Sequence, residues 1–215
     1  MNYLDLKSAC DSHDALVVTV SKMQEIEKVM KIYHQGCRDF AENRVHELIK
    51  KAKQMPMDVR WHLIGQLQRN KVKEILPYVH LIHSVDRFSL LEEIHKHAVE
   101  MGKKVSVLLE LKLAQEDTKS GFLVDELYKS LKEDNWSKMT HVKVIGIMAM
   151  ASNTTDQAII RNEFKLAKSI FEQLKLNFFA GAEFNQLSMG MSSDYLIALE
   201  EGSTIVRVGS LLFTE

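Results

Sequence analysis

The chain has 215 residues, of which 46% are hydrophobic and 27% are charged, so it is long enough to bury one substantial core. Its 28 Lys and Arg residues nearly balance its 29 Asp and Glu residues, and this gives no basic excess of the kind typical of nucleic-acid binding. We find neither a signal-peptide pattern nor an apolar run of the roughly 18–20 residues that cross a bilayer. The two cysteines, Cys10 and Cys37, lack metal-ligand spacing, and we expect free thiols in a cytoplasmic protein.

Short apolar runs alternate along the chain with longer amphipathic stretches. The runs predict strands over 15–22, 38–43, 60–65, 81–86, 104–113, 142–150, 177–184 (with room to extend toward Met189) and 203–213. The stretches between them carry apolar residues at spacings of three and four. They predict helices over 23–36, 44–55, 70–79, 89–102, 123–134, 156–175 and 193–202.

This alternation predicts parallel strands that are covered by helices, because strands buried on both faces have continuous apolar runs. Right-handed crossovers lead either to an open doubly wound sheet or to a closed barrel. Eight strand–helix units in about 200 residues favour the barrel, since a flavodoxin-like sheet needs fewer strands. We therefore expect a single α/β domain over residues 1–215, a (β/α)8 TIM barrel.

In such a barrel the functional site lies where the strands end. The first strand ends at Lys22, which is either a solvated strand terminus or an amine held in a pocket for chemistry. The loop LSMGMSSD supplies the hydroxyls of Ser188 and Ser192, and Gly209 lets a backbone N–H approach a ligand. Loops after strands seven and eight of such barrels often bind phosphate. A lysine opposite a phosphate site fits pyridoxal 5'-phosphate, whose aldehyde forms a Schiff base with lysine.

Longer motifs make the prediction specific. The segments are VVTVSK, FAENRVHE, WHLIGQLQRNK, HSVDR, EDTKSG and LSMGMSSDYLIALEEGSTIVRVGSLLF. In this order and at these separations they resemble the pyridoxal phosphate homeostasis proteins, a family similar to the N-terminal barrel domain of alanine racemase. The resemblance covers nearly the whole chain, and its longest motifs have too mixed a composition for chance agreement.

The resemblance also implies roles for individual residues. Lys22 would hold pyridoxal 5'-phosphate as a covalent aldimine, and Arg207 would contact the pyridine nitrogen. Ser188, Gly209 and Ser210 would bind the phosphate. Asn43 and His83 would line the pocket around the ring. Lys119 follows the fifth strand in a polar loop, where it is either exposed to solvent or lies above the pocket for a transient cofactor contact. Of the neighbouring polar residues, Glu42 is expected to form a structural ion pair, and His62 is either a core residue or a pocket residue.

The family has no established catalytic reaction, and two chemical arguments agree with this. Arginine is a permanent donor, so Arg207 would leave the pyridine ring neutral and a weak electron sink. Racemisation also needs a second acid or base, which in alanine racemase is a tyrosine supplied through a two-domain dimer. Burial is expected to lower the pKa of the Lys22 amine and make it nucleophilic.

We therefore expect a monomeric pyridoxal phosphate binding protein that acts in vitamin B6 and amino-acid homeostasis. It would have no catalytic residue, no metal and neither a nucleic-acid nor a membrane partner. The first alternative is a pyridoxal phosphate-dependent enzyme of the amino-acid racemase type. The second is a barrel that binds another phosphorylated ligand without covalent chemistry.

Overall fold

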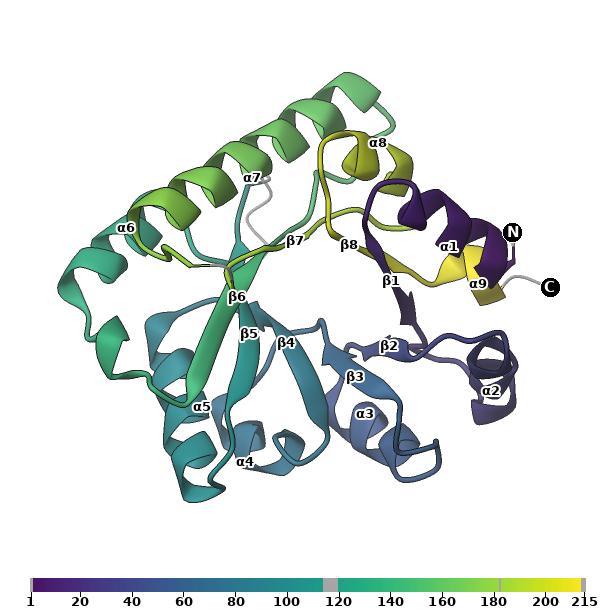
Figure 1. The fold of residues 1–215 in the computed structure, drawn as a ribbon, viewed down its shortest axis with the longest axis horizontal. Helices are drawn as coiled ribbons and strands as arrows, with labels where there is room; N and C mark the ends of the chain where they lie inside the picture. Colours follow the sequence, from purple (N-terminus) through teal and green to yellow (C-terminus); the bar gives the residue numbers. More distant parts are fainter. Residues whose placement is uncertain (1, 114–119, 182, 214–215) are drawn as a thin grey trace.

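Eight parallel strands close into a barrel in their order along the chain, with helices around the outside (Figure 1). The computed structural model describes residues 2–113, 120–181 and 183–213. The strands are β1 (Leu16–Val20), β2 (Asp39–Glu42), β3 (Arg60–Leu63), β4 (Val79–Val85), β5 (Val105–Leu111), β6 (Val142–Ala149), β7 (Gln186–Ser188) and β8 (Ile205–Val208). The first strand pairs with both the second and the eighth, which closes the barrel and confirms the predicted fold class.

Helix α1 precedes the first strand, and the other helices lie between the strands or after the last one. They are α1 (Tyr3–Asp11), α2 (Ile26–His34), α3 (Val45–Ala52), α4 (Val72–Ile75), α5 (Phe88–Glu100), α6 (Val124–Glu133), α7 (Gln157–Asn177), α8 (Tyr195–Glu200) and α9 (Ser210–Phe213), with 3-10 turns at Arg69–Lys71 and Trp136–Lys138. The two chain ends lie near each other, beside α1 and α9 (Figure 1). The start and the end of the sequence therefore build the same side of the molecule.

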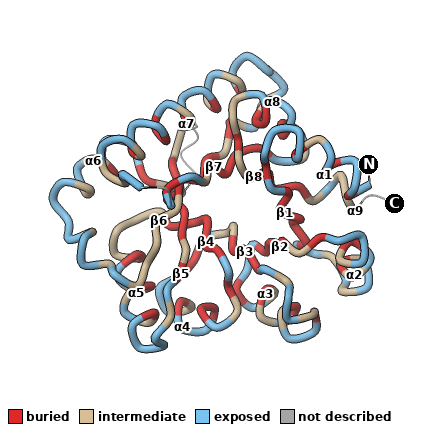
Figure 2. The backbone as a smooth tube through the Cα atoms, viewed as in Figure 1, coloured by how far each residue is buried: buried red, intermediate tan, exposed pale blue. Residues whose placement is uncertain are grey.

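Two apolar layers hold the barrel, because successive side chains of a strand point to opposite faces. The inner layer is small and contains Val18, Val20, Ala41, Leu81, Leu108, Met148 and Ile205. The outer layer packs strands against helices and is much larger. Figure 2 shows the consequence: buried residues concentrate in the central strands, and exposed residues form the outer rim of the helices.

The first helix was not predicted, although its signals are present in the sequence. The Asn2 side chain accepts a hydrogen bond from the Asp5 N–H at 2.9 Å, and the Asp5 carboxylate accepts one from the Asn2 N–H. This reciprocal arrangement is a capping box. Tyr3, Leu6 and Cys10 follow at helical spacing, and all three are buried.

The seventh strand was predicted in the wrong place. Helix α7 continues to Asn177, and β7 begins only at Gln186. The apolar residues that suggested a strand form an aromatic cluster instead: the rings of Phe179 and Phe184 stack at 4.7 Å, and Phe171 of α7 stacks on Phe184 at 5.2 Å. Packing against α7 thus determines the conformation of this segment, which an apolar run alone does not reveal.

The eighth strand is also shorter than predicted. It ends at Val208, and residues 210–213 form a helical turn in which the Leu212 N–H donates to the Gly209 carbonyl at 2.9 Å. A Cβ on Gly209 would lie 2.8 Å from the Val20 carbonyl oxygen, so only glycine fits beside β1 at this point. The predicted helix over 70–79 is likewise reduced to a 3-10 turn and α4, because Pro77 cannot continue it. The other predicted elements differ from the observed ones mainly at their ends.

Candidate functional site

A cavity of about 450 Å³ lies at the C-terminal ends of the strands. Five of the seven predicted cofactor-binding residues line it, namely Lys22, Asn43, Arg207, Gly209 and Ser210. The remaining lining residues are Val20, Ile64, Met148, Met150, Met191, Ser192 and Ser193. Barrel closure brings residues from both ends of the chain together here, which agrees with the expected position of a TIM-barrel site.

Lys22 lies two residues beyond β1, in a turn that leads to α2. Its side chain is exposed at the cavity, so the burial that we expected around the amine is not found. Within the described part of the chain, no hydrogen bond or ion pair joins the Lys22 amine to another residue. The next residue, Met23, has a left-handed backbone with φ of 60° and a side chain that is 93% exposed. The amine is therefore accessible and uncommitted.

A buried ion pair braces the backbone just before Lys22. The Lys51 amine lies 2.6 Å from the Glu42 carboxylate and donates to the Ser21 carbonyl, also at 2.6 Å. The Ser21 hydroxyl donates to the same carboxylate at 2.7 Å. The expected structural role of Glu42 is confirmed. The brace fixes the base of the Lys22 side chain and leaves its amine free.

Arg207 enters the cavity from β8 and is almost completely buried. Its Nη1 donates to the Ser188 hydroxyl at 2.6 Å, and its Nη2 donates to the Ala149 carbonyl at 3.1 Å. Burial lowers the pKa of the guanidinium to about 10, and the charges of Asp194 and Glu110 oppose this effect. Since arginine has five N–H donors, donors remain for a ligand in the cavity.

The two other predicted residues, Ser188 and His83, do not line the cavity. Both are fully buried, and the His83 Nδ1 lies 3.1 Å from the Ser188 hydroxyl. The pKa of His83 lies well below 6.5 because the ring is completely buried and because electrostatic interactions with His62 and Arg207 also lower it. These two side chains stand behind Arg207 rather than on the cavity wall.

The wall near β7 and β8 offers small polar groups. Ser192, Ser193 and Ser210 line it, and the Gly209 N–H donates to the Ser192 hydroxyl at 3.3 Å. Gly190 precedes them with φ of 92°, and a Cβ there would lie 2.5 Å from the Cβ of Ala198. This collection of hydroxyl and N–H groups can hold a phosphate.

Asn43 lies on the opposite wall, directly after β2. Its position depends on Gly65, because a Cβ on that glycine would lie 2.2 Å from the Asn43 carbonyl oxygen. Sequence reasoning named Gly65 only as the end of a strand. A glycine is required here because the backbone of Asn43 packs closely against it, and the sequence does not show which residues pack together.

Glu110 is a second residue that the sequence analysis missed. It interrupts the apolar strand β5, is 3% exposed, and accepts a hydrogen bond from the Ser120 hydroxyl at 3.0 Å. Burial raises its pKa to about 7, and the Ser120 hydrogen bond only partly offsets this. A single acidic residue inside an otherwise apolar strand was the available signal. Lys119, which we expected above the pocket, lies outside the described residues.

A neighbouring cavity of about 510 Å³ shares Lys22 and Asn43 with the first. It lies beside α2 and α3, and charged residues such as Arg44, Glu47 and Lys50 line it. Lys22 is therefore open to both cavities.

No group of three or more His, Cys, Asp or Glu side chains among the described residues is placed to hold a metal ion. None of the helices formed by these residues is both long and apolar enough to span a membrane.

Comparison with known proteins places the geometry in context. The family described as alanine racemase, N-terminal domain matches residues 1–215. The pyridoxal phosphate homeostasis protein of Aquifex aeolicus is 37% identical over 202 residues, which cover 94% of this chain and 87% of that protein.

Solved structures agree with these sequence matches. PipY of Synechococcus elongatus, determined without pyridoxal phosphate, superposes with a TM-score of 0.88 at 32% identity, covering 94% of this chain and 93% of PipY. PipY with pyridoxal phosphate bound gives a TM-score of 0.85 at the same identity and coverage. Alanine racemase of Clostridium difficile, at 14% identity and a TM-score of 0.76, covers 100% of this chain with 61% of its own length and shares the fold.

Proposed function

Because the chain belongs to the alanine racemase N-terminal domain family and, within it, to the pyridoxal phosphate homeostasis proteins, we propose that it binds pyridoxal 5'-phosphate in the 450 Å³ cavity. The observation that carries this proposal is the convergence of Lys22, Arg207 and Gly209 on one cavity. The volume lies within the range of small-ligand sites, about 300–1,000 Å³. The protein would serve vitamin B6 and amino-acid homeostasis as a monomer in the cytoplasm.

The residues present fit the aldehyde, the phosphate and the ring nitrogen of the cofactor. Its aldehyde would form a Schiff base with the uncommitted Lys22 amine. Ser192, Ser210 and the N–H groups around Gly209 would hold the phosphate, and Arg207 would donate to the pyridine nitrogen. When bound, the cofactor supplies an electron sink, and a ring nitrogen without a proton makes that sink weak.

The lining also supports binding without turnover. Racemisation needs an acid or base on each face of the substrate carbon. Among the described residues that line the 450 Å³ cavity, the ionisable ones are Lys22 and Arg207. Arg207 holds its proton too tightly to act as a general base, so the described lining supplies no second base.

The test is titration of the purified chain with pyridoxal 5'-phosphate, followed by borohydride reduction and peptide mass spectrometry. We expect a visible absorption band and a modified peptide that contains Lys22. Lys50→Ala is the matched control, because Lys50 lines the neighbouring cavity but not the 450 Å³ cavity. Absence of the band at saturating cofactor would reject the binding proposal. Turnover of free amino acids that is lost in Lys22→Ala would reject the non-catalytic part.

A further inference from the structure

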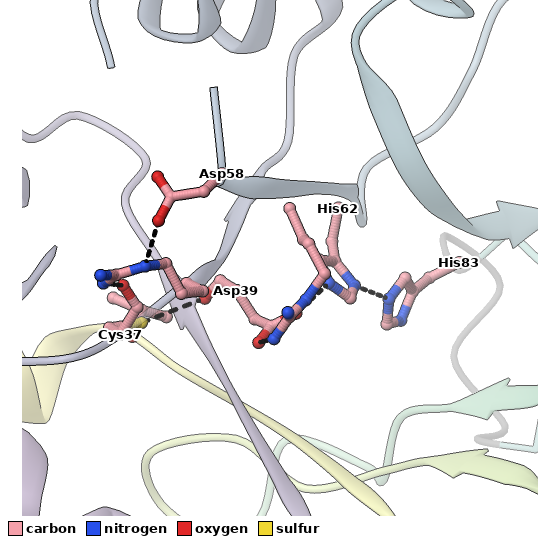
Figure 3. Close-up of polar contacts among 8 residues, drawn as sticks. Cys37, Asp39, Asp58, His62 and His83 are labelled. Atoms are coloured by element: carbon pink, nitrogen blue, oxygen red, sulfur yellow. Dashed lines mark hydrogen bonds and ion pairs between the residues drawn. The ribbon is translucent and has the colours of Figure 1, made fainter. Parts of the chain in front are cut away.

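A line of buried side chains connects the two ends of the barrel through its interior. Figure 3 shows its central part, where Asp39, His62 and His83 point toward one another from β2, β3 and β4. The His62 Nε2 lies 3.2 Å from the Asp39 carboxylate, and the His62 Nδ1 lies 2.9 Å from the His83 Nε2. The full order is Arg60, Asp39, His62, His83, Ser188 and Arg207.

One end of this line meets solvent and the other meets the cavity. The Arg60 side chain is 46% exposed at the start of β3, and its Nε donates to Asp39 at 2.7 Å. Arg207 lines the cavity at the opposite end of the barrel. Every member between these arginines is buried, so water does not compete for its hydrogen bonds.

The direction of each hydrogen bond follows from the chemistry of the two ends. Burial alone would raise the pKa of Asp39, but hydrogen bonds from His62 and Arg60 outweigh it and lower the value to about 2. The carboxylate therefore only accepts, and the His62 Nε2 must carry the hydrogen. If His62 carries only this hydrogen, its Nδ1 presents a lone pair, and the hydrogen between the two rings then belongs to the His83 Nε2.

The same reasoning continues to Arg207. A neutral His83 with its hydrogen on Nε2 has a lone pair on Nδ1, which accepts from the Ser188 hydroxyl. The Ser188 oxygen is then free to accept from Arg207, which can only donate. With both rings in the neutral state, all hydrogen bonds run one way, from Arg207 to Asp39. No buried side-chain nitrogen or oxygen among the described residues lacks a partner, which agrees with this assignment.

We propose that His62, His83 and Ser188 are positioning residues that orient the Arg207 guanidinium toward the cavity by a one-way chain of hydrogen bonds ending at Asp39. The inference rests on the proposed function, because it states how the ligand-facing donor is held. Contacts to Ser188 and Ala149 use different guanidinium nitrogens and fix the plane of this flat group. The remaining N–H groups then select a ligand whose ring nitrogen accepts a hydrogen bond, as an unprotonated pyridine does.

The first experiment needs no ligand. Long-range ¹H–¹⁵N correlation spectra of the full chain at pH 7 report the tautomer of each imidazole, and His62→Gln and His83→Gln variants identify the two rings among the nine histidines. We expect both rings to be neutral with the hydrogen on Nε2. A hydrogen on Nδ1 of either ring, or a doubly protonated ring, would overturn the one-way chain. This result does not depend on whether the protein binds pyridoxal 5'-phosphate.

The second experiment separates positioning from phosphate contact by comparing pyridoxal with pyridoxal 5'-phosphate. If Ser188 acts through Arg207, Ser188→Ala weakens binding of both ligands by the same factor, roughly tenfold for one lost hydrogen bond. A loss for the phosphorylated ligand alone, or no loss for either, would reject the positioning role. If the wild-type chain binds neither ligand, the proposed function fails while the tautomer result stands.

A matched pair at His83 refines this test. Asn places its amide near the ring Nδ1 and keeps an acceptor for Ser188, whereas Gln places its amide near Nε2 and loses that contact. We expect His83→Asn to bind both ligands more tightly than His83→Gln. Equal affinities of the two variants would contradict the chain. His80→Gln is the control, because its ring lies 5.7 Å from His62 but belongs to no step of the chain.

Discussion

The two sides of the barrel mouth hold their functional groups in opposite ways. On the β1–β2 side, the buried Glu42–Lys51 pair braces the Ser21 backbone and leaves the Lys22 amine free. On the β7–β8 side, the side chain of Arg207 is itself held by two hydrogen bonds. A group that must form and release a covalent bond gains from mobility, whereas a group that recognises one ring atom gains from fixed orientation. The difference therefore matches the roles that we propose for the two residues.

The largest predicted effect on this comparison comes from removing the free amine of Lys22. We expect Lys22→Ala to abolish borohydride-fixed pyridoxal 5'-phosphate completely, because the attachment site is gone. Stability should change by no more than about 0.5 kcal/mol, since the side chain is exposed. Mass spectrometry after reduction measures the first effect and urea denaturation the second. Retained covalent cofactor elsewhere in the cavity would show that Lys22 is not the attachment residue.

Breaking the brace should affect stability instead. Lys51→Met leaves the Glu42 carboxylate buried without a cation, and we expect a loss of about 3–5 kcal/mol in the free energy of unfolding. The double variant Glu42→Gln with Lys51→Met removes the uncompensated charge and should recover part of this loss. Urea denaturation of both variants checks the prediction. A loss below about 1 kcal/mol in the single variant would mean that water reaches the pair.

The next prediction concerns Glu110, a buried acid that we expect to lower the stability of the folded protein at high pH. Its folded pKa of about 7 lies above the ordinary value of 4.5, so the folded state holds the proton more tightly than the unfolded state. Stability from this group is thus complete below about pH 4.5 and is lost as the pH rises through 7. We expect Glu110→Gln to be more stable than wild type by about 2–3 kcal/mol at pH 8 and to lack this decline. Unfolding curves from pH 5 to pH 8 that run parallel for the two proteins would refute it.

The smallest predicted effect concerns Arg207 on the β7–β8 side of the barrel mouth. Arg207→Lys keeps a cation but loses the flat fork that bonds Ser188 and Ala149 together. We expect affinity for pyridoxal 5'-phosphate to fall by roughly tenfold, measured by absorbance titration. Arg69→Lys is the control, because Arg69 pairs with Glu93 on an exposed helix surface. Equal affinities of Arg207→Lys and wild type would show that orientation at this position is unimportant.

Much of the site was predictable because its chemistry is local to short motifs. Lys22, Asn43, Gly209 and Ser210 follow strand ends and Arg207 lies near the end of β8, and parallel strands of one barrel bring those ends to one place. The placement of Ser188 was less predictable because the strand that contains it, Gln186–Ser188, was predicted over 177–184. A strand's faces alternate with a period of two, so the start of a strand decides which side chains point where.

The sequence alone determined the alternation of strands and helices and favoured the closed barrel, because these follow from local apolar patterns and from the number of strand–helix units. It also carried the motifs that resemble the family. Only the tertiary structure decided which polar residues reach the cavity and which stand behind it. Ser192 lines the wall, whereas Ser188 joins His83 and His62 in the interior. It also showed that Lys22 is exposed while Lys51 is buried, although both carry the same amine. The physical reason is that burial and hydrogen-bond partners depend on contacts between strands that are distant in the chain, and no local pattern records them.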